Sequence, residues 1–330
     1  MKAIVQDRYG SPDVLEFRDT ARPLPGGGEI VVRVHAAGVD AGVGHLTTGH
    51  PYLLRLLGFG LHGPKQPVRG LDFAGTVEEV GEGVSRVRPG DEVFGVCEGA
   101  FAEYAVAKQD LVAAKPGRLS FEQAAAVLVS GGTALQAVRD VGRVRPGQRV
   151  LVIGAAGGVG TFAVQLAKAF GADVTGVCST AKTDLVRSLG AEHVVDYTRE
   201  DFAAEQYDLI VDAAGLRSLT ALRRALAPRG TLVLVGGENG GRWLGGIQRV
   251  VRAALLNPFV RQRLCGLVSR VRAADLEALR DLIEAGQLTP ALDRTYPLAD
   301  AAAAIGHLTA GRAAGKVVLT GLTGLTGLKA

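Results

Sequence analysis

Cysteine is scarce in this sequence: its 330 residues include three, Cys97, Cys178 and Cys265, at wide separations. This spacing fits neither a disulfide framework nor a pair of metal ligands, so we expect each to be a small apolar side chain in the interior. Apolar runs long enough to span a membrane are also missing, and Met1–Asp7 turns polar too early for a signal peptide. We therefore expect a cytoplasmic protein with no membrane partner.

Basic stripes interleaved with aromatic residues, which are typical of nucleic-acid-binding proteins, are absent as well. The net charge is +4, but the arginines that supply most of it are scattered, so we predict no nucleic-acid partner. One basic segment runs from Arg242 to Arg263 and includes the only tryptophan, Trp243. We interpret this segment as a solvated face with a helix near a dimer contact, and the alternative is a surface that binds a partner or nucleic acid.

The chain is organised around a glycine cluster that follows a short apolar run, Val150–Ile153. Residues 155–160 fit the spacing A-x-G-x-x-G, another glycine precedes them, and an apolar helical pattern continues to Phe170. A tight turn into a helix N-terminus lets backbone N–H groups approach a pyrophosphate. We therefore predict a dinucleotide site that includes Gly154, Ala156, Gly157, Gly158, Val159 and Gly160.

Four further apolar runs follow at the spacing expected for strands separated by helices. They are residues 174–177, 193–195, 209–212 and 232–235, and the last is ended by Gly236 and Gly237, which we add to the predicted cofactor site. Strands that alternate with helices predict a parallel, doubly wound α/β sheet.

The two ends of the chain have a different pattern. Residues 1–120 contain short alternating runs punctuated by proline and glycine, which predicts a mostly antiparallel β domain. A helical pattern begins at Ser120, which can form a capping box with Gln123, and a lone strand, Lys316–Leu319, closes the chain. The apolar loop from Gly49 to Pro67 either walls a substrate pocket or packs locally. The length suggests two domains.

The second strand of the nucleotide domain ends without the acidic residue that an NAD site normally places about 20 residues after the first glycines. Residues 177–180 contain no carboxylate, whereas Ser179 can donate a hydrogen bond and Lys182 can supply a positive charge. This pattern favours a cofactor with a 2′-phosphate, so we predict NADPH. The alternative makes Lys182 an ordinary solvated lysine.

Together these motifs resemble the medium-chain dehydrogenase/reductase superfamily and, within it, the zinc-free quinone oxidoreductase (ζ-crystallin-like) branch. The resemblance covers nearly the whole chain. Besides the glycine loop, it is carried by Gly70–Gly75, Val80–Val84 with Pro89–Val93, Gly131–Ala134, Leu189–Tyr197 and Gly315–Leu319. It implies a Rossmann-type doubly wound sheet at residues 121–287, inserted into a mostly β, GroES-like barrel catalytic domain made of residues 1–120 and 288–330.

The resemblance also implies individual site residues and an assembly. Tyr197 matches a phosphate-contacting tyrosine of the branch, and Arg312 is a weaker candidate for the same role. Asp40 and Thr133 fall among the cofactor-binding positions. A homodimer is implied too. The apolar run Leu264–Val268 points the same way, because it would otherwise form an exposed edge strand.

Metal-dependent members of the superfamily carry a cysteine near position 40 and Gly-His-Glu near position 71, where this chain has Asp40 and Leu71-Asp72. The thiolate and imidazole ligands that zinc favours are missing, so we predict no metal. Similar reductases usually have Asn at 40 and Asp at 43, and this chain departs from them with Asp40 and Val43. His45 falls where relatives place a Tyr or His that faces the nicotinamide pocket.

We expect an NADPH-dependent reductase whose small-molecule substrates are quinones or α,β-unsaturated carbonyls. Hydride delivery to such an acceptor leaves charge on oxygen, which needs hydrogen-bond donors and a proton. His45, Tyr52 and Thr133 are the candidate side chains, and water is another possible proton source. One alternative is an enoyl reductase that acts on a polyketide or acyl thioester intermediate. The other is a cofactor-binding protein with a partner- or nucleic-acid-binding role.

Overall fold

The computed structural model describes residues 1–237 and 241–321, which form two compact units. Unit 1 comprises Met1–Val129, Val271–Gly286 and the chain from Pro290, and unit 2 comprises Ser130–Arg270 and Gln287–Thr289. None of the helices in the described ranges combines the length and the apolar character needed to cross a bilayer.

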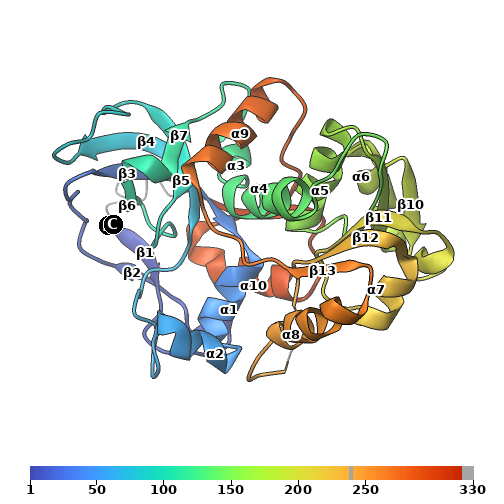
Figure 1. Cartoon of the computed structure of the whole chain (residues 1–330). Helices are drawn as coiled ribbons and strands as arrows, with labels where there is room; N and C mark the ends of the chain where they lie inside the picture. The colour runs from blue at the N-terminus through green and yellow to red at the C-terminus, as the bar shows by residue number, and fades with distance from the viewer. Residues whose placement is uncertain (238–240, 322–330) are drawn as a thin grey trace. The chain divides into compact units, whose positions relative to one another are not determined.

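Unit 1 is built on a seven-stranded sheet in which strands from both chain ends are neighbours (Figure 1). The order is β14-β15-β3-β4-β5-β7, with β6 paired to β3. The C-terminal β15 runs antiparallel to β3, so Val317 lies opposite Val39. The strands of this sheet are β3 (Glu29–Val39), β4 (Asp72–Val80), β5 (Glu92–Val96), β6 (Tyr104–Lys108), β7 (Val112–Ala114), β14 (Leu292–Pro297) and β15 (Lys316–Thr320).

In the described part of unit 1, a second sheet and five α-helices accompany this sheet, besides short 3₁₀ and π-helical segments. β1 (Lys2–Val5) and β2 (Glu16–Asp19) pair with one another, and the helices are α1 (Ala41–Thr48), α2 (Tyr52–Leu54), α3 (Phe121–Ala124), α9 (Ala273–Glu284) and α10 (Ala301–Thr309). The core includes Ile30, Val32 and Val34 of β3 and Phe73 of β4, all fully buried. β-Branched and aromatic side chains favour the pleated strand because they pack well on its surface.

Unit 2 is a doubly wound parallel sheet of six strands, as the alternation of apolar runs and helical patterns predicted. The order is β10-β9-β8-β11-β12-β13, and α5 and α6 lie on one face while α7 and α8 lie on the other (Figure 1). The strands are β8 (Arg149–Ile153), β9 (Asp173–Cys178), β10 (His193–Asp196), β11 (Tyr207–Asp212), β12 (Leu226–Leu234) and β13 (Arg263–Gly266). The helices are α5 (Gly158–Ala169), α6 (Thr183–Ser188), α7 (Leu219–Ala225) and α8 (Ile247–Leu256).

The predicted domain boundaries at 120/121 and 287/288 stay a prediction. In the structure the chain returns to unit 2 for Gln287–Thr289, whereas Val271–Gly286, which contains α9, belongs to unit 1. Two contacts hold α9 there: Arg118 Nη1 donates to the Ile283 carbonyl over 3.2 Å, and Arg86 forms an ion pair with Glu277 at 3.1 Å. A helical pattern by itself does not tell which domain its apolar face packs on.

The helical pattern that begins at Ser120 is present in the structure. Ser120 and Gln123 form the predicted capping box at the start of α3. The stretch around Thr133 is continuous helix in α4 (Leu128–Leu135). Its glycines are buried, so the helix tolerates them where tertiary packing supplies the stability that propensity does not.

A buried ion pair ties α8 to the sheet. Arg249 of α8 donates to Asp212 Oδ2 over 2.6 Å and to the Arg217 carbonyl over 2.8 Å. Asp212 has no solvent exposure, and its second carboxylate oxygen accepts the Gly215 N–H at 3.0 Å. Removing one partner of such a pair leaves a charge buried without compensation.

We therefore predict that Arg249→Met lowers the free energy of unfolding by about 3–5 kcal/mol. Arg252→Met is the matched control, because Arg252 lies one turn later in α8 and is exposed, and it should change stability by less than about 0.5 kcal/mol. Urea unfolding followed by circular dichroism measures both. Equal losses in the two variants would contradict the role given to the pair.

Candidate functional site

The glycine loop of unit 2 connects β8 to α5. Gly154 follows β8 with φ +80°, a conformation that favours glycine, and its carbonyl accepts the Gly157 N–H at 2.9 Å. Gly157 is the residue that precedes α5. The first N–H groups of an α-helix have no acceptor within the helix and carry partial positive charge. The loop therefore offers the backbone donors that a pyrophosphate needs, contributed by the predicted positions Gly158, Val159 and Gly160.

Gly160 explains why the helix can start so close to the strand. A Cβ at this position would lie 2.0 Å from the Gly154 carbonyl oxygen and 2.8 Å from Ala155 Cα. Only glycine permits that approach. Ala156, the remaining predicted residue of the loop, is buried behind it.

The predicted 2′-phosphate residues follow the ends of two neighbouring strands. Ser179 comes directly after β9, and Tyr197 comes directly after β10. The two strands are parallel and in register, and the Tyr197 N–H donates to the Cys178 carbonyl over 3.2 Å. Sheet pairing therefore brings Ser179 and Tyr197 close together. Lys182, half-buried, ends the 3₁₀ turn that leads into α6.

A carboxylate that the prediction missed lies near this group. Asp196 ends β10 and is almost buried, and it accepts hydrogen bonds from the hydroxyl groups of Thr180 and Thr198. These bonds, Thr180 first, hold the pKa of Asp196 below its usual range. The sequence analysis looked for an acidic residue at the end of β9, and Asp196 was missed because it belongs to the neighbouring strand β10. Its partners are protein hydroxyls, so it differs from an acid that is presented to a ribose.

Arg217 is a second residue that the sequence analysis missed. Its guanidinium lies 5.4 Å from the centre of the Tyr197 ring and 5.7 Å from that of Phe202. The Tyr197 side chain is half exposed. Arg217 follows β11 in a loop, and nothing in the local pattern separates it from the other scattered arginines of the chain.

The glycines after β12 lie at the same edge of the sheet. The Gly236 N–H donates to the Asp212 carbonyl at the end of β11 over 3.0 Å. Gly237 approaches the backbone of Gly246 so closely that a Cβ would lie 2.6 Å from its Cα. The carboxyl ends of parallel strands form the edge where doubly wound sheets bind nucleotides. The donors present there in unit 2 fit a dinucleotide.

In unit 1, the predicted residue Asp40 belongs to a buried cluster of three charged groups. Asp40 follows β3, Lys316 begins β15 and Asp72 begins β4, so the pairing of these strands brings them together. Lys316 Nζ forms an ion pair with Asp40 and lies 3.9 Å from Asp72 Oδ2. All three side chains are at most 6% exposed. The role of Asp40 in cofactor binding stays a prediction, and its observed partner is Lys316.

Asp72 is the member of the cluster whose protonation the structure perturbs most. Burial, followed by the nearby Asp40 carboxylate, raises the pKa of Asp72 well above its usual range, while Lys316 and the Val129 N–H act in the opposite direction. The Val129 N–H donates to Asp72 Oδ1 over 3.0 Å. With Asp72 protonated, one carboxylate and one ammonium remain, and the buried cluster is neutral.

The predicted catalytic residues are divided between the units. His45 is half-buried in α1, and Tyr52 begins α2 with its ring 4.8 Å from both the His50 ring centre and the Arg55 guanidinium. Arg312 is exposed in the segment after α10. Thr133 lies in α4, in unit 2. Neither unit by itself contains all three predicted catalytic side chains.

Comparison with known proteins gives matches over both units. Residues 26–117 match the model of the alcohol dehydrogenase GroES-like domain, and residues 189–319 match that of a zinc-binding dehydrogenase. The quinone oxidoreductase of Sus scrofa is 31% identical over 97% of this chain and 97% of its own length. The crystal structure of Escherichia coli quinone oxidoreductase complexed with NADPH has a TM-score of 0.83 and 27% identity, covering 97% of this chain and 100% of that one.

One further relative belongs to a biosynthetic system. The spectinabilin polyketide synthase system protein NorB of Streptomyces orinoci is 36% identical over 77% of this chain, which corresponds to 12% of that protein.

The residues of this chain do not fit the zinc named in one of these family descriptions. Within residues 1–237 and 241–321, no group of three or more histidine, cysteine, aspartate and glutamate side chains is placed to hold a metal ion. The two carboxylates at positions 40 and 72 already have a cation beside them, the ammonium of Lys316.

The buried cluster predicts a specific pH dependence of stability. Because the pKa of Asp72 is raised in the folded protein, its contribution to stability is complete below the usual aspartate range and is lost as pH rises through the raised value. Between those limits the unfolding free energy should fall with a slope approaching about 1.4 kcal/mol per pH unit. Asp72→Asn, which keeps the shape of a protonated carboxyl group, should remove this fall.

Urea unfolding at a series of pH values measures the effect. Asp13→Asn, in an exposed turn of unit 1, should leave the profile of the unmodified protein unchanged. Lys316→Met should cost about 3–5 kcal/mol at neutral pH, since it leaves Asp40 buried without its cation. A profile of Asp72→Asn that runs parallel to that of the unmodified protein would show that Asp72 is ionised throughout.

Proposed function

The chain belongs to the quinone oxidoreductase branch of the medium-chain dehydrogenase/reductase superfamily, and we propose that it uses NADPH to reduce quinones or α,β-unsaturated carbonyls. It is an oxidoreductase of the nicotinamide-dependent type. The preference for NADPH over NADH and the class of acceptor are the parts that we propose.

The observation that carries the cofactor proposal is the set of groups at the end of β9. Ser179 and Lys182 offer a hydroxyl group and an ammonium group where an NAD site would offer a carboxylate. Asp196, the carboxylate at the end of β10, is engaged by Thr180 and Thr198. A phosphate dianion would therefore meet positive charge and hydrogen-bond donors, with Tyr197 and Arg217 beside them.

When bound, the cofactor supplies the hydride for the reduction. The contribution of the chain is to hold and polarise the reactants. The glycine loop and the N-terminus of α5 bind the pyrophosphate. The groups after β9 and β10 bind the 2′-phosphate on the adenosine ribose. His45, Tyr52 and Thr133 remain the proposed donors to the acceptor oxygen, on which negative charge develops.

The NorB match favours a second candidate, an enoyl reductase that acts on an acyl thioester. Steady-state NADPH oxidation with a panel of quinones, enones and enoyl thioesters distinguishes the two. Turnover of quinones or enones well above that of thioesters supports the first proposal, and the reverse order supports the second. A homodimer formed through the edge strand β13 and a cytoplasmic location complete the proposal.

We further predict that activity does not depend on a metal. Lys316 lies beside the two carboxylates that stand at the ligand positions of metal-dependent relatives, and its ammonium group disfavours a second cation there. Metal analysis of the purified protein should find less than stoichiometric zinc, and dialysis against a chelator should leave the rate unchanged. Stoichiometric zinc that is lost together with activity would refute the prediction.

The cofactor assignment predicts the effect of Lys182→Ala. A hydrogen bond to a charged group contributes about 1.5–3 kcal/mol, so the KM for NADPH should rise roughly tenfold to hundredfold. The KM for NADH should change little, because NADH has no 2′-phosphate for Lys182 to contact. Initial rates measured against each cofactor give both values.

Lys168→Ala is the matched control for this experiment. Lys168 is an exposed lysine of the same unit, in the last turn of α5, and pairs with Glu192 at 3.7 Å. Its removal should leave both KM values unchanged. Equal increases in the KM for NADPH and the KM for NADH in Lys182→Ala would show that the lysine does not contact the 2′-phosphate.

A further inference from the structure

Helix α8 has apolar residues on two opposite faces. At 3.6 residues per turn, Val250, Ala253 and Leu256 lie on the face that packs on the core of unit 2. Ile247, Val251 and Leu255, at spacings of four, lie on the other face and are 38%, 50% and 68% exposed. The ion pair of Arg249 with Asp212 fixes which face of α8 is turned toward the core. Ile247, Val251 and Leu255 therefore lie on the face that α8 turns to solvent.

Two large aromatic side chains extend this stripe at its ends. Trp243 precedes α8 and is 73% exposed, and Phe259 follows it and is 85% exposed. So many large exposed apolar side chains within one segment of chain are uncommon on a protein surface unless something covers them. We call Trp243, Ile247, Val251, Leu255 and Phe259, together with Arg252 and Arg261, the α8 surface.

The charge around the α8 surface has one sign. Residues 241–274 include seven arginines and no aspartate or glutamate. Arg252 and Arg261 are both exposed, and neither forms an ion pair with a residue that the structure describes. An occupant of this surface must therefore offer apolar area and negative charge at the same time.

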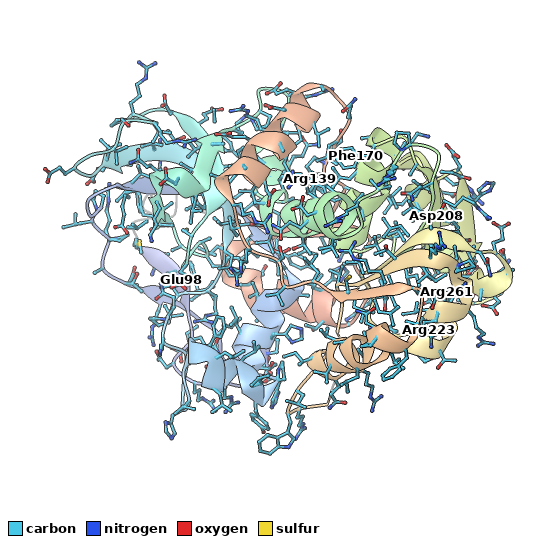
Figure 2. All side chains as sticks on the ribbon, viewed as in Figure 1. Glu98, Arg139, Phe170, Asp208, Arg223 and Arg261 are labelled. Atoms are coloured by element: carbon cyan, nitrogen blue, oxygen red, sulfur yellow. The ribbon has the colours of Figure 1, made fainter. Side chains whose placement is uncertain are left out.

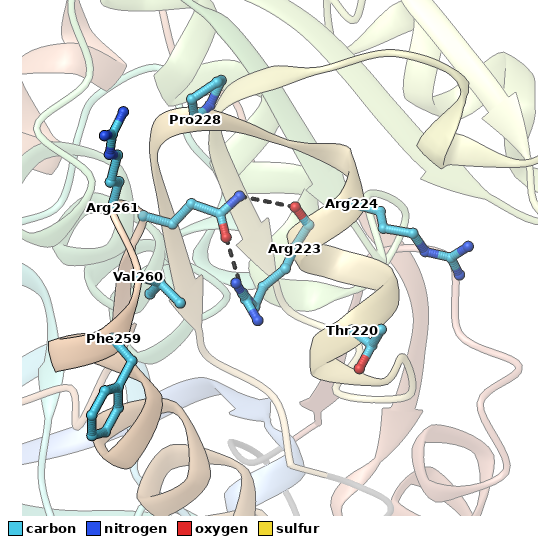
Figure 3. A pocket seen from close by; sticks show the side chains of 8 residues that line it. Thr220, Arg223, Arg224, Pro228, Phe259, Val260 and Arg261 are labelled. Carbon is cyan, nitrogen blue, oxygen red and sulfur yellow. Dashed lines mark hydrogen bonds between the residues drawn. The ribbon is translucent and has the colours of Figure 1, made fainter.

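A pocket of about 380 Å³ adjoins the surface at Phe259. Three arginines line it, Arg223, Arg224 and Arg261, and Figure 2 places Arg223 and Arg261 on the unit-2 side of the molecule. In Figure 3, Arg224 and Arg261 extend to opposite sides with Arg223 between them, and Arg223 is held by Gln262 at 3.0 Å. No carboxylate lines the pocket, so the positive charge of the α8 surface continues around its rim.

We propose that the α8 surface docks on an anionic lipid bilayer. The apolar stripe and the two aromatic side chains enter the headgroup region, the exposed arginines attract the anionic headgroups, and the arginine-lined pocket receives a headgroup phosphate. Interfacial helices have this composition, with apolar and aromatic residues on one face and arginines beside them. The inference concerns binding, so it goes beyond the proposed reaction and does not depend on it.

The observations favour lipid over the other occupants. A second copy joined face to face on this patch would present the same residues, which would bring Arg252 and Arg261 of one copy against those of the other, and the homodimer proposed above pairs instead through β13. Nucleic acid would satisfy the charge and could stack bases on Trp243 and Phe259, but it would leave the aliphatic side chains of Ile247, Val251 and Leu255 without apolar cover. The sequence analysis predicted no membrane partner because it considered only runs long enough to span one.

The single tryptophan makes the proposal directly measurable. Vesicles of phosphatidylcholine with phosphatidylglycerol should shift the emission of Trp243 to shorter wavelengths and carry the protein into the vesicle pellet. Vesicles of phosphatidylcholine alone should do neither, and added salt should weaken the binding. Arg252→Gln with Arg261→Gln should lower the partition coefficient roughly thirtyfold, which is about 2 kcal/mol. Val251→Gln with Leu255→Gln should lower it by about tenfold or more.

Matched controls separate these effects from general charge and polarity. The double variant Arg88→Gln with Arg187→Gln removes two exposed arginines outside the α8 surface. Leu24→Gln replaces an exposed leucine of unit 1. Both control variants should bind the vesicles as the unmodified protein does. Failure to bind the anionic vesicles, or binding that the α8 variants leave unchanged, overturns the proposal. Two other results also overturn it. An emission shift of Trp243 that depends on protein concentration in the absence of lipid would identify a second copy as the occupant. A shift caused by an oligonucleotide and not by vesicles would identify nucleic acid.

Discussion

The cofactor loop depends on one close backbone approach, that of Gly160 to the carbonyl oxygen of Gly154. A Cβ at 160 would lie 2.0 Å from that oxygen, so glycine at this position allows α5 to begin at Gly158, only a tight turn after β8 ends at Ile153. The N-terminus of the helix is thereby held at the edge where the other parallel strands also end. Ser179, Tyr197 and Gly236 reach that edge through the register of the sheet, and each of them follows directly or closely on a strand.

The two units differ in where their charged side chains lie. In unit 1, strand pairing buries Asp40, Lys316 and Asp72 together, and burial raises the pKa of Asp72, which favours its neutral form. In unit 2, Arg249 is buried against Asp212, whereas Arg252, one turn later, is left in solvent beside an apolar stripe. A buried charge must be compensated within the fold, while an exposed one remains available to an external partner. This difference underlies both the zinc-independent chemistry and the docking surface that we propose.

Local patterns in the sequence predicted the features that depend on local geometry. The glycine spacing identified the tight turn between β8 and α5, and the alternation of apolar runs with helical patterns identified the parallel sheet. Contacts between distant residues were not predictable in this way: Lys316 and Asp40 are 276 positions apart, and Asp196 reaches the end of β9 only through the pairing of β10. The grouping of α9 with unit 1 was not predictable either, since periodicity identifies an apolar face but not the surface that it covers.

Selection of the 2′-phosphate by the groups after β9 is the central claim, and two fragments of the cofactors isolate it. Adenosine 2′,5′-bisphosphate and adenosine 5′-monophosphate differ only in that phosphate, so calorimetric titration of each into the unmodified protein measures its contribution without any substrate. The account predicts that the bisphosphate binds at least about tenfold more tightly, as one hydrogen bond to a charged group requires. Equal affinity for the two fragments would contradict it.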